Sequence, residues 1–322
     1  MIGQGADIVN GGADSDTLVI VGGAGDETLT VVSVGAVLTT VAGGAVTGIE
    51  SVTANLDGGI DALSYAGNAA ANGVTVNLGT STATGFTSIV GFENVTGGAG
   101  ADTLTGDGNA NVLNGGAGVD TINGGAGNDI LNGGAGGDIL TGGDGVDAIN
   151  TGAAEDDIID VIRFSADTEY GGTITNFDAS GGAGVEDRVD FGGALDALFD
   201  DGGTNNTFVF VTDNNTNNDN VAVNLNGATE ALILDGANGE GVTNANLGSA
   251  AAVAAEFNAE FAITAAAGES TMLVINDTNG DSASVWQYLE NGTTAEIQVG
   301  ELTLIVTINA NATIAANNFD LF

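Results

Sequence analysis

Apolar residues recur at every ninth position between residues 97 and 159, and each of them lies two residues after an acid or an asparagine. We call residues 97–159 the nonapeptide block. Six copies follow one another without spacers, and TGAAEDDII is a decayed seventh: GGAGADTLT, GDGNANVLN, GGAGVDTIN, GGAGNDILN, GGAGGDILT and GGDGVDAIN. In each copy the glycine-rich hexapeptide predicts a turn, and the last three residues predict a short strand with one inward side chain. A strict period of this kind predicts a solenoid of stacked turns and strands. The predicted inward residues are Leu104, Leu113, Ile122, Leu131, Leu140, Ile149 and Ile158.

The same pattern extends toward the N-terminus, where longer insertions separate the copies. Three weaker copies place an aspartate at the sixth position: Asp7 in IGQGADIVN, Asp16 in GGADSDTLV and Asp61 in LDGGIDALS. Two strand-rich stretches between these copies end in the related sequences VTGIESV (46–52) and IVGFENV (89–95). This internal duplication predicts that longer coils alternate with strict nonapeptide coils in one continuous structure.

The nine-residue period disappears beyond Asp160, and this predicts a domain boundary. We expect an all-β protein in which residues 1–160 form a right-handed parallel β-roll or β-helix solenoid. Residues 161–322 are predicted to form a second, mostly antiparallel β module with one short helix.

Two elements of the second module are predicted individually. Val253, Phe257 and Phe261 form one apolar helical stripe in an Ala-rich stretch that ends before Gly268. The segments TMLVIN and SASVWQYLE predict a β-hairpin around DTNGD (277–281). Serine and tyrosine stand where an EF-hand loop needs its glycine and its last glutamate, so we expect a turn there and not a calcium loop.

The composition is strongly acidic: 2 basic and 43 acidic residues give a net charge of −41, and there is no histidine and no cysteine. We expect no nucleic-acid partner and no insertion into membranes, because basic patches and long apolar segments are both missing. Carboxylate and carbonyl oxygens suit hard divalent cations, calcium above all. A solvated acidic surface is the alternative explanation of the charge, but it does not explain aspartates at every ninth residue.

The sixth-position side chains are the candidate calcium ligands. Because two copies make one coil of eighteen residues, side chains of alternate copies stack roughly one strand spacing apart, about 4.8 Å. A cation between two such carboxylates converts repulsion into ligation, and carbonyls of the glycine-rich turns would complete each shell. Asn111 lacks the charge, so we expect the site that it shares with Asp129 to be the weakest. The complete candidate set is Asp7, Asp16, Asp61, Asp102, Asn111, Asp120, Asp129, Asp138, Asp147 and Asp156, with Gly97, Gly115, Gly124, Gly133 and Gly142.

The phrase GGxGxD followed by x, an aliphatic residue and x resembles the hemolysin-type repeat-in-toxin (RTX) calcium-binding repeat. This resemblance implies a β-roll with several calcium ions in its turns, in a secreted protein exported through a type I secretion channel by an uncleaved C-terminal signal. The ending NNFDLF is similar to such signals. Residues 160–191 resemble the segment that closes the roll in RTX exoproteins, where Arg163 and Arg188 would pair with aspartates.

These observations favour an extracellular structural protein, and they do not indicate an enzyme. No nucleophile motif, phosphate loop or zinc motif is present, so a catalytic domain, if there is one, would precede Met1. S-layer proteins and adhesins share the roll and the composition, which suggests calcium-dependent self-assembly at the cell surface. The alternative is a non-catalytic secretion and folding module of a larger RTX enzyme or toxin. No cap precedes the first repeat, so either Met1 begins a fragment or this end is a contact surface.

Overall fold

The computed structural model contains mostly β-strands and describes the following residues: 9–10, 12, 15–42, 44–47, 49–152, 158–164, 171–179, 187–191, 210–213, 221–224, 231–234, 247–264, 270–276, 282–289, 297, 302–310 and 319–320. It forms two compact units, Met1–Gly143 with Asn150–Gly152, and Asp144–Ile149 with Ala153–Phe322. The division at residue 160 stays a prediction. None of the helical residues described forms a segment long and apolar enough to cross a membrane.

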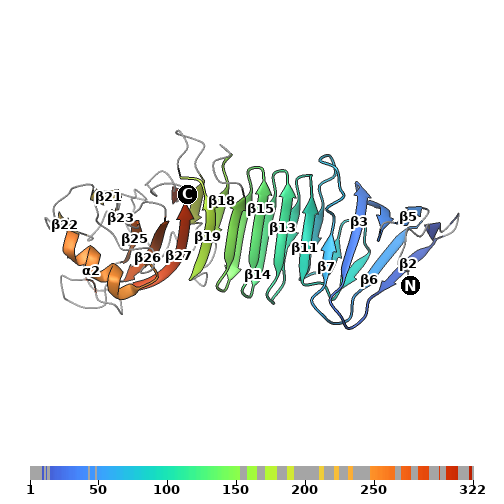
Figure 1. Cartoon of the computed structure of the whole chain (residues 1–322), viewed down its shortest axis with the longest axis horizontal. Helices are drawn as coiled ribbons and strands as arrows, with labels where there is room; N and C mark the ends of the chain where they lie inside the picture. The colour runs from blue at the N-terminus through green and yellow to red at the C-terminus, as the bar shows by residue number, and fades with distance from the viewer. Residues whose placement is uncertain are drawn as a thin grey trace. The chain divides into compact units, whose positions relative to one another are not determined.

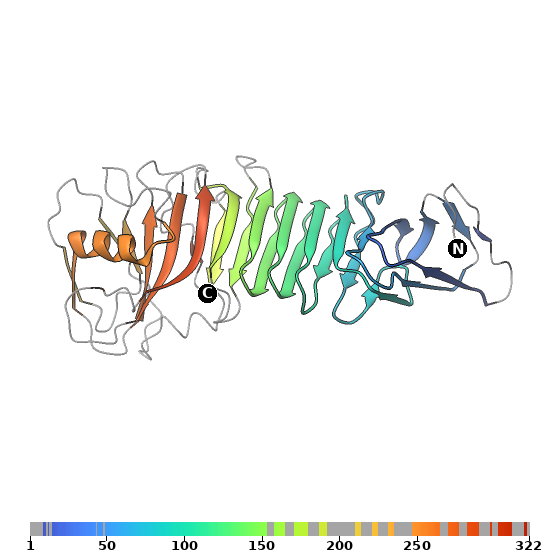
Figure 2. The same ribbon diagram turned by 60° about the horizontal axis from the view of Figure 1, so that its bottom comes forward.

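The nonapeptide block forms parallel strands whose register repeats every eighteen residues. On one side β11 (Asn94–Gly98), β13 (Val112–Ala117) and β15 (Ile130–Ala135) are hydrogen-bonded in that order. On the other side β8 (Thr75–Asn77), β12 (Thr103–Thr105) and β14 (Thr121–Ala126) form the matching ladder. The strands lie side by side as successive rungs in Figures 1 and 2. The two remaining strands of the block are β16 (Ile139–Asp144) and β17 (Ala148–Gly152). The predicted parallel β-roll is confirmed.

The eighth-position side chains form the core of the block. Leu104, Leu113, Ile122, Leu131 and Leu140 are fully buried, and Ile149 is 5% exposed. Each coil contributes one aliphatic side chain from each of its two strands, so this core is thin.

The prediction of the core is wrong for one residue. Ile158 is 42% exposed, whereas Ile162, in β18 (Val161–Phe164), is fully buried. Among the described residues, the next inward aliphatic position after Ile149 is therefore Ile162, thirteen residues later instead of nine.

Longer coils precede the block, as predicted. β2 (Thr17–Val21), β6 (Ser51–Asn55) and β10 (Ser88–Val90) form a three-stranded parallel sheet. β3 (Thr28–Val34) and β7 (Ala62–Ser64) extend the ladder that contains β11.

An antiparallel extension accompanies these coils. It consists of β3, β4 (Val37–Val41) and β5 (Gly44–Thr47). Two short strands flank the region: β1 (Val9–Asn10) pairs with β5, and β9 (Thr82–Ala83) pairs with β8.

The second unit contains the expected antiparallel strands. β25 (Ser270–Asn276), β26 (Ser282–Leu289) and β27 (Leu302–Ala310) form an antiparallel sheet, which confirms the hairpin. The tip of the hairpin, DTNGD, lies outside the described residues.

Parallel pairs are also present in this unit. β18, β20 (Arg188–Phe191) and β28 (Phe319–Asp320) form one ladder, and β19 (Gly172–Phe177) pairs with β27. β21 (Phe210–Asp213), β23 (Ala231–Leu234) and β25 form a second ladder. β22 (Val221–Asn224) pairs with β24 (Phe261–Thr264).

The predicted helix is α2 (Ala250–Glu260). Val253 and Phe257 are fully buried and belong to one core cluster with Trp286 and Tyr288. The extension of the stripe to Phe261 is wrong, because this residue begins β24. The β-favouring sequence Phe-Ala-Ile-Thr pairs there with β22 and ends the helix.

Candidate calcium sites

The sixth-position side chains of the nonapeptide block are buried where each turn meets its strand. Their exposed fractions range from 0 to 7% for Asp102, Asn111, Asp120, Asp129, Asp138 and Asp147. Burial of a carboxylate away from water is unfavourable unless hydrogen bonds or a cation compensate for the lost hydration. The structure therefore has to stabilise a row of buried charges.

Hydrogen bonds between successive coils provide part of this compensation. The backbone N–H of Asp102 donates to Oδ1 of Asp120 at 2.8 Å, and the N–H of Asp120 donates to Oδ1 of Asp138 at 2.8 Å. On the opposite edge, the N–H of Asn111 donates to Oδ1 of Asp129 at 2.7 Å. These bonds confirm the predicted eighteen-residue stacking, and they show that one oxygen of each of these aspartates fixes the register between coils.

The second carboxylate oxygen faces a small space lined by oxygen atoms. Oδ2 of Asp120 is buried and accepts no hydrogen bond. A Cβ atom added at Gly115 would overlap this oxygen and would also lie 2.6 Å from the carbonyl oxygen of Gly133. Only glycine leaves the space open, and a carboxylate oxygen beside a carbonyl oxygen is the donor set that calcium prefers. The buried oxygen without a partner thus fits a cation.

Glycine, carboxylate and carbonyl are arranged in the same way along the block, although Oδ2 of Asp102, unlike that of Asp120, accepts the N–H of Gly98 at 2.6 Å. The open space beside Gly97 is bordered by Asp102 and the carbonyl of Gly115, and the space beside Gly124 is bordered by Asp129 and the carbonyl of Gly142. Among the described residues, no three carboxylate, histidine or cysteine side chains converge on one point. Main-chain carbonyl oxygens would therefore have to supply ligands beside each aspartate, as expected for a hard cation in a glycine-rich turn.

Asn111 presents a neutral oxygen in place of a charged one. Its Nδ2 donates to the carbonyl oxygen of Glu93 at 2.7 Å, and its Oδ1 accepts from the N–H of Asp107 at 2.9 Å. This orients Oδ1 toward the space beside Gly106. The site keeps an oxygen ligand but lacks the charge of a carboxylate, which is the physical reason to expect weaker calcium binding there. This weaker binding stays a prediction.

Burial changes the acidity of the aspartates. It raises the pKa of Asp102, against the lowering effect of two backbone N–H donors. Burial also raises the pKa of Asp120 to about 6, and the neighbouring charge of Asp102 adds to this effect. A bound cation would remove both penalties, because it favours the ionised form.

The N-terminal candidates lie on similar ladders whose partners are glutamates. Asp61 is fully buried; its Oδ1 accepts from the N–H of Glu27 at 2.7 Å, and its own N–H donates to Oε2 of Glu93 at 2.7 Å. Asp16, which is half-buried, donates its N–H to Oε2 of Glu50 at 2.7 Å. Sequence reasoning missed these glutamates, although GGAGDETLT (22–30) is the same phrase with Glu27 at its sixth position. Asp7 lies outside the described residues.

In the second unit the sixth position is taken by Asp160 and Asp187, which were not predicted. Both are buried, each lies two residues before a buried aliphatic, and the N–H of Asp160 donates to Oδ1 of Asp187 at 2.8 Å. The predicted ligand Asp156 lies outside the described residues. Arg163 pairs with Asp190 at 3.0 Å, which confirms the expected arginine–aspartate pairing for this residue.

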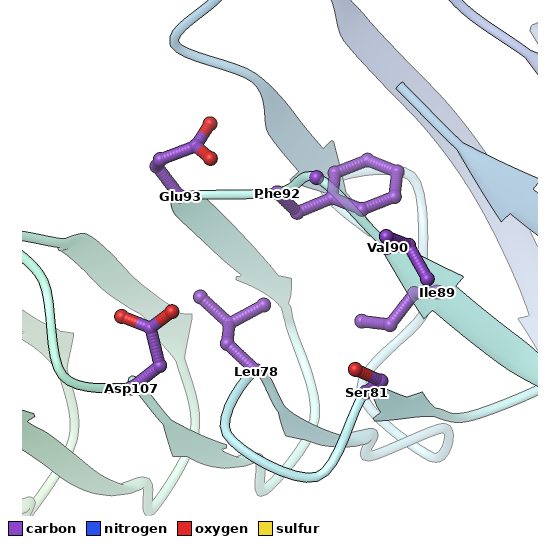
Figure 3. A pocket seen from close by; sticks show the side chains of 8 residues that line it. Leu78, Ser81, Ile89, Val90, Phe92, Glu93 and Asp107 are labelled. Carbon is purple, nitrogen blue, oxygen red and sulfur yellow. The ribbon is translucent and has the colours of Figure 1, made fainter. Parts of the chain in front are cut away.

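A cavity of about 230 Å³ lies beside the turn that contains Asp107 (Figure 3). The carboxylates of Glu93 and Asp107 are at one side of it, near Leu78, and Ile89 and Ser81 are at the other. Oxygens of both carboxylates already accept hydrogen bonds, from Asp61 and from Asn109 respectively. We therefore do not include this cavity among the calcium sites.

The fold and the oxygen-lined turns define a calcium-binding parallel β-roll. A family model for the RTX calcium-binding nonapeptide repeat matches residues 3–18, 90–122 and 123–158, as four copies. The chain therefore contains RTX calcium-binding repeats, and repeats of this kind are typical of secreted proteins. No curated protein matches the chain.

Replacing Gly115 by alanine tests the open space directly. The added Cβ would overlap Oδ2 of Asp120, so we expect a several-fold higher calcium concentration for half-maximal folding, measured by circular dichroism. Gly108→Ala is the matched control, because a Cβ atom there would have no neighbour within 4 Å. Equal calcium midpoints in the two variants would contradict the assignment.

Proposed function

We propose that this chain is an extracellular structural protein without catalytic activity. Its nonapeptide block folds when calcium binds after export, and the folded chains then associate into a surface layer, filament or adhesin. The observation that carries the proposal is the row of buried sixth-position aspartates, whose oxygens face spaces that only glycine leaves open. Calcium would bind to Asp102, Asp120, Asp129 and their neighbours and neutralise their charge.

The distribution of charge supports self-assembly. Apart from Asp144, the last residue of β16, the described acidic residues of the nonapeptide block lie in turns, and the other outward residues of its strands are uncharged. Val112 and Ile130 are adjacent on one such face and are 44% and 51% exposed. In a chain with a net charge of −41, these flat faces are surfaces on which two copies can approach once calcium neutralises the edges.

Oligomer size as a function of calcium tests this function. We expect a monomer in calcium-free buffer and large assemblies at millimolar calcium, measured by light scattering coupled to size-exclusion chromatography and by electron microscopy. Magnesium at the same ionic strength is the control, because its strict octahedral geometry suits these turns poorly. A monodisperse monomer at millimolar calcium would exclude self-assembly.

That outcome would favour the second candidate, a non-catalytic secretion and folding module of a larger RTX protein. This candidate is supported by the RTX repeats and by a second unit with its own buried core around α2 and β26. Removal of residues 270–322 would then abolish export through a type I channel.

A further inference from the structure

We infer that residues 17–96, which we call the N-terminal coil, fold without calcium and act as the template on which the nonapeptide block folds. The inference rests on calcium-dependent folding of the block, as proposed above. According to this inference, one part of the continuous coil is folded with or without calcium, and the other part folds only when calcium binds.

The N-terminal coil has a much denser apolar core than the block. Seventeen apolar side chains are buried among its described residues, but only six are buried in the described part of the block, so the coil buries about twice as many per residue. They include a tyrosine and a phenylalanine, Tyr65 and Phe92, whereas the block contributes only single leucines and isoleucines. Apolar burial is the main favourable contribution to folding, so the coil depends less on bound ions.

A leucine takes the place of the carbonyl ligand in the turn between Gly22 and Glu27. Gly22 and Glu27 correspond to the first and sixth positions of a nonapeptide, as Gly115 and Asp120 do. At Gly115 the neighbour from the next coil is the carbonyl oxygen of Gly133. At Gly22 it is Leu56, which is 3% exposed and whose Cδ2 would lie 2.7 Å from an added Cβ, while Oε2 of Glu27 would lie 2.9 Å from it. This turn therefore has a carboxylate oxygen but a hydrocarbon side chain where the turn of Gly115 has a carbonyl oxygen, so it offers a cation fewer ligands.

Uncharged hydrogen bonds connect the strands of the N-terminal coil. The N–H of Ser33 donates to Oδ1 of Asn68 at 2.9 Å, and Nδ2 of Asn68 donates to Oγ of Ser33 at 2.8 Å. Both side chains are buried. The hydroxyl of Tyr65 donates to the carbonyl oxygen of Thr84 at 2.6 Å. These bonds hold the antiparallel extension and β8–β9 to the coil without any ion.

The N-terminal coil presents ready-made edges to the block. β11 and β8 pair in register with β13 and β12, and Figure 1 shows β11 beside β13. A coil that is already ordered offers its hydrogen-bonding groups to the first nonapeptides. Adding a coil to such an edge avoids the cost of nucleating a new stack.

Hydrogen exchange of the whole chain in calcium-free buffer tests the inference. We expect amides of β3, β6 and β7 to be protected at least ~100-fold, and amides of β13 to β15 to exchange at nearly unstructured rates. With calcium, both groups should be protected. If β3, β6 and β7 also exchange freely without calcium, the inference is wrong but the proposed function stands. If β13 to β15 are protected without calcium, the proposed folding switch itself is wrong.

The direction of folding distinguishes a template from an independent domain. After calcium is added, pulse-labelled exchange should show protection at β12 and β13 before β15 and β16. Protection that appears first at β16 would overturn the template role.

A variant of the leucine provides a second readout. Leu56→Ala should reduce the calcium-free protection of β3 and β7 by ~10-fold or more, because it removes a buried side chain from between two coils. Val90→Ala, at a side chain that is 51% exposed in the same coil, is the control. Equal protection in the two variants would contradict the role given to Leu56.

Discussion

Replacing Asp120 by asparagine should raise the calcium concentration needed to fold the nonapeptide block by about tenfold or more, equivalent to about 1.4 kcal/mol. The amide oxygen can still accept the N–H of Asp102, so the register between coils is kept. The loss is confined to Oδ2, the buried oxygen that accepts no hydrogen bond and faces the space beside Gly115. An asparagine NH₂ group there cannot bind a cation and would face the carbonyl oxygen of Gly133.

Asp107→Asn is the matched control for this variant. It removes the same charge from a neighbouring turn, but the Asp107 carboxylate binds Asn109 of its own turn and does not stand at a sixth position. Calcium titrations followed by circular dichroism, with isothermal calorimetry for stoichiometry, compare the two. We expect the D120N variant to lose about one ion while D107N binds the full number. A similar shift in both variants would show that net charge, and not ligation by Asp120, controls folding.

The sequence alone predicts the nonapeptide block in detail because each of its positions has one structural role. The sixth-position side chains are buried in the turns, and the eighth-position side chains from Leu104 to Ile149 form the core. Period and composition were sufficient here, since an insertion of even one residue would exchange the inward and outward faces of a strand.

The same reasoning fails where the repeat is interrupted. The sequence TGAAEDDIIDVIRF offers three aspartates, and the pattern favours Asp156 by counting nine residues. Asp156 lies outside the described residues, and the structure buries Asp160 and Ile162, two residues apart like every other sixth and eighth position. The spacing of an acid two residues before a buried aliphatic still identifies sixth positions where the nine-residue period is lost. It also identifies Glu27 and Glu93.

Acid should partly replace calcium in folding the nonapeptide block. In calcium-free buffer, we expect β-structure measured by circular dichroism to increase as the pH is lowered from about 7 to about 5. At limiting calcium, we expect the opposite, because protons compete with the ion for the same oxygens. Sodium chloride at neutral pH is the control for general screening of a chain with a net charge of −41.

The sign of this effect follows from the buried aspartates. The pKa of Asp120 rises from an ordinary value of 3.8 to about 6 in the folded chain, and that of Asp102 rises in the same direction. Between these two values the folded chain binds more protons than the unfolded chain, so the free energy of unfolding is largest below the ordinary pKa and decreases as the pH rises through about 6. Above that range a cation would offset the part of the buried charge that the backbone hydrogen bonds do not compensate. If lowering the pH leaves the calcium-free spectrum unchanged while salt restores structure, general repulsion and not the burial of these two aspartates keeps the block unfolded.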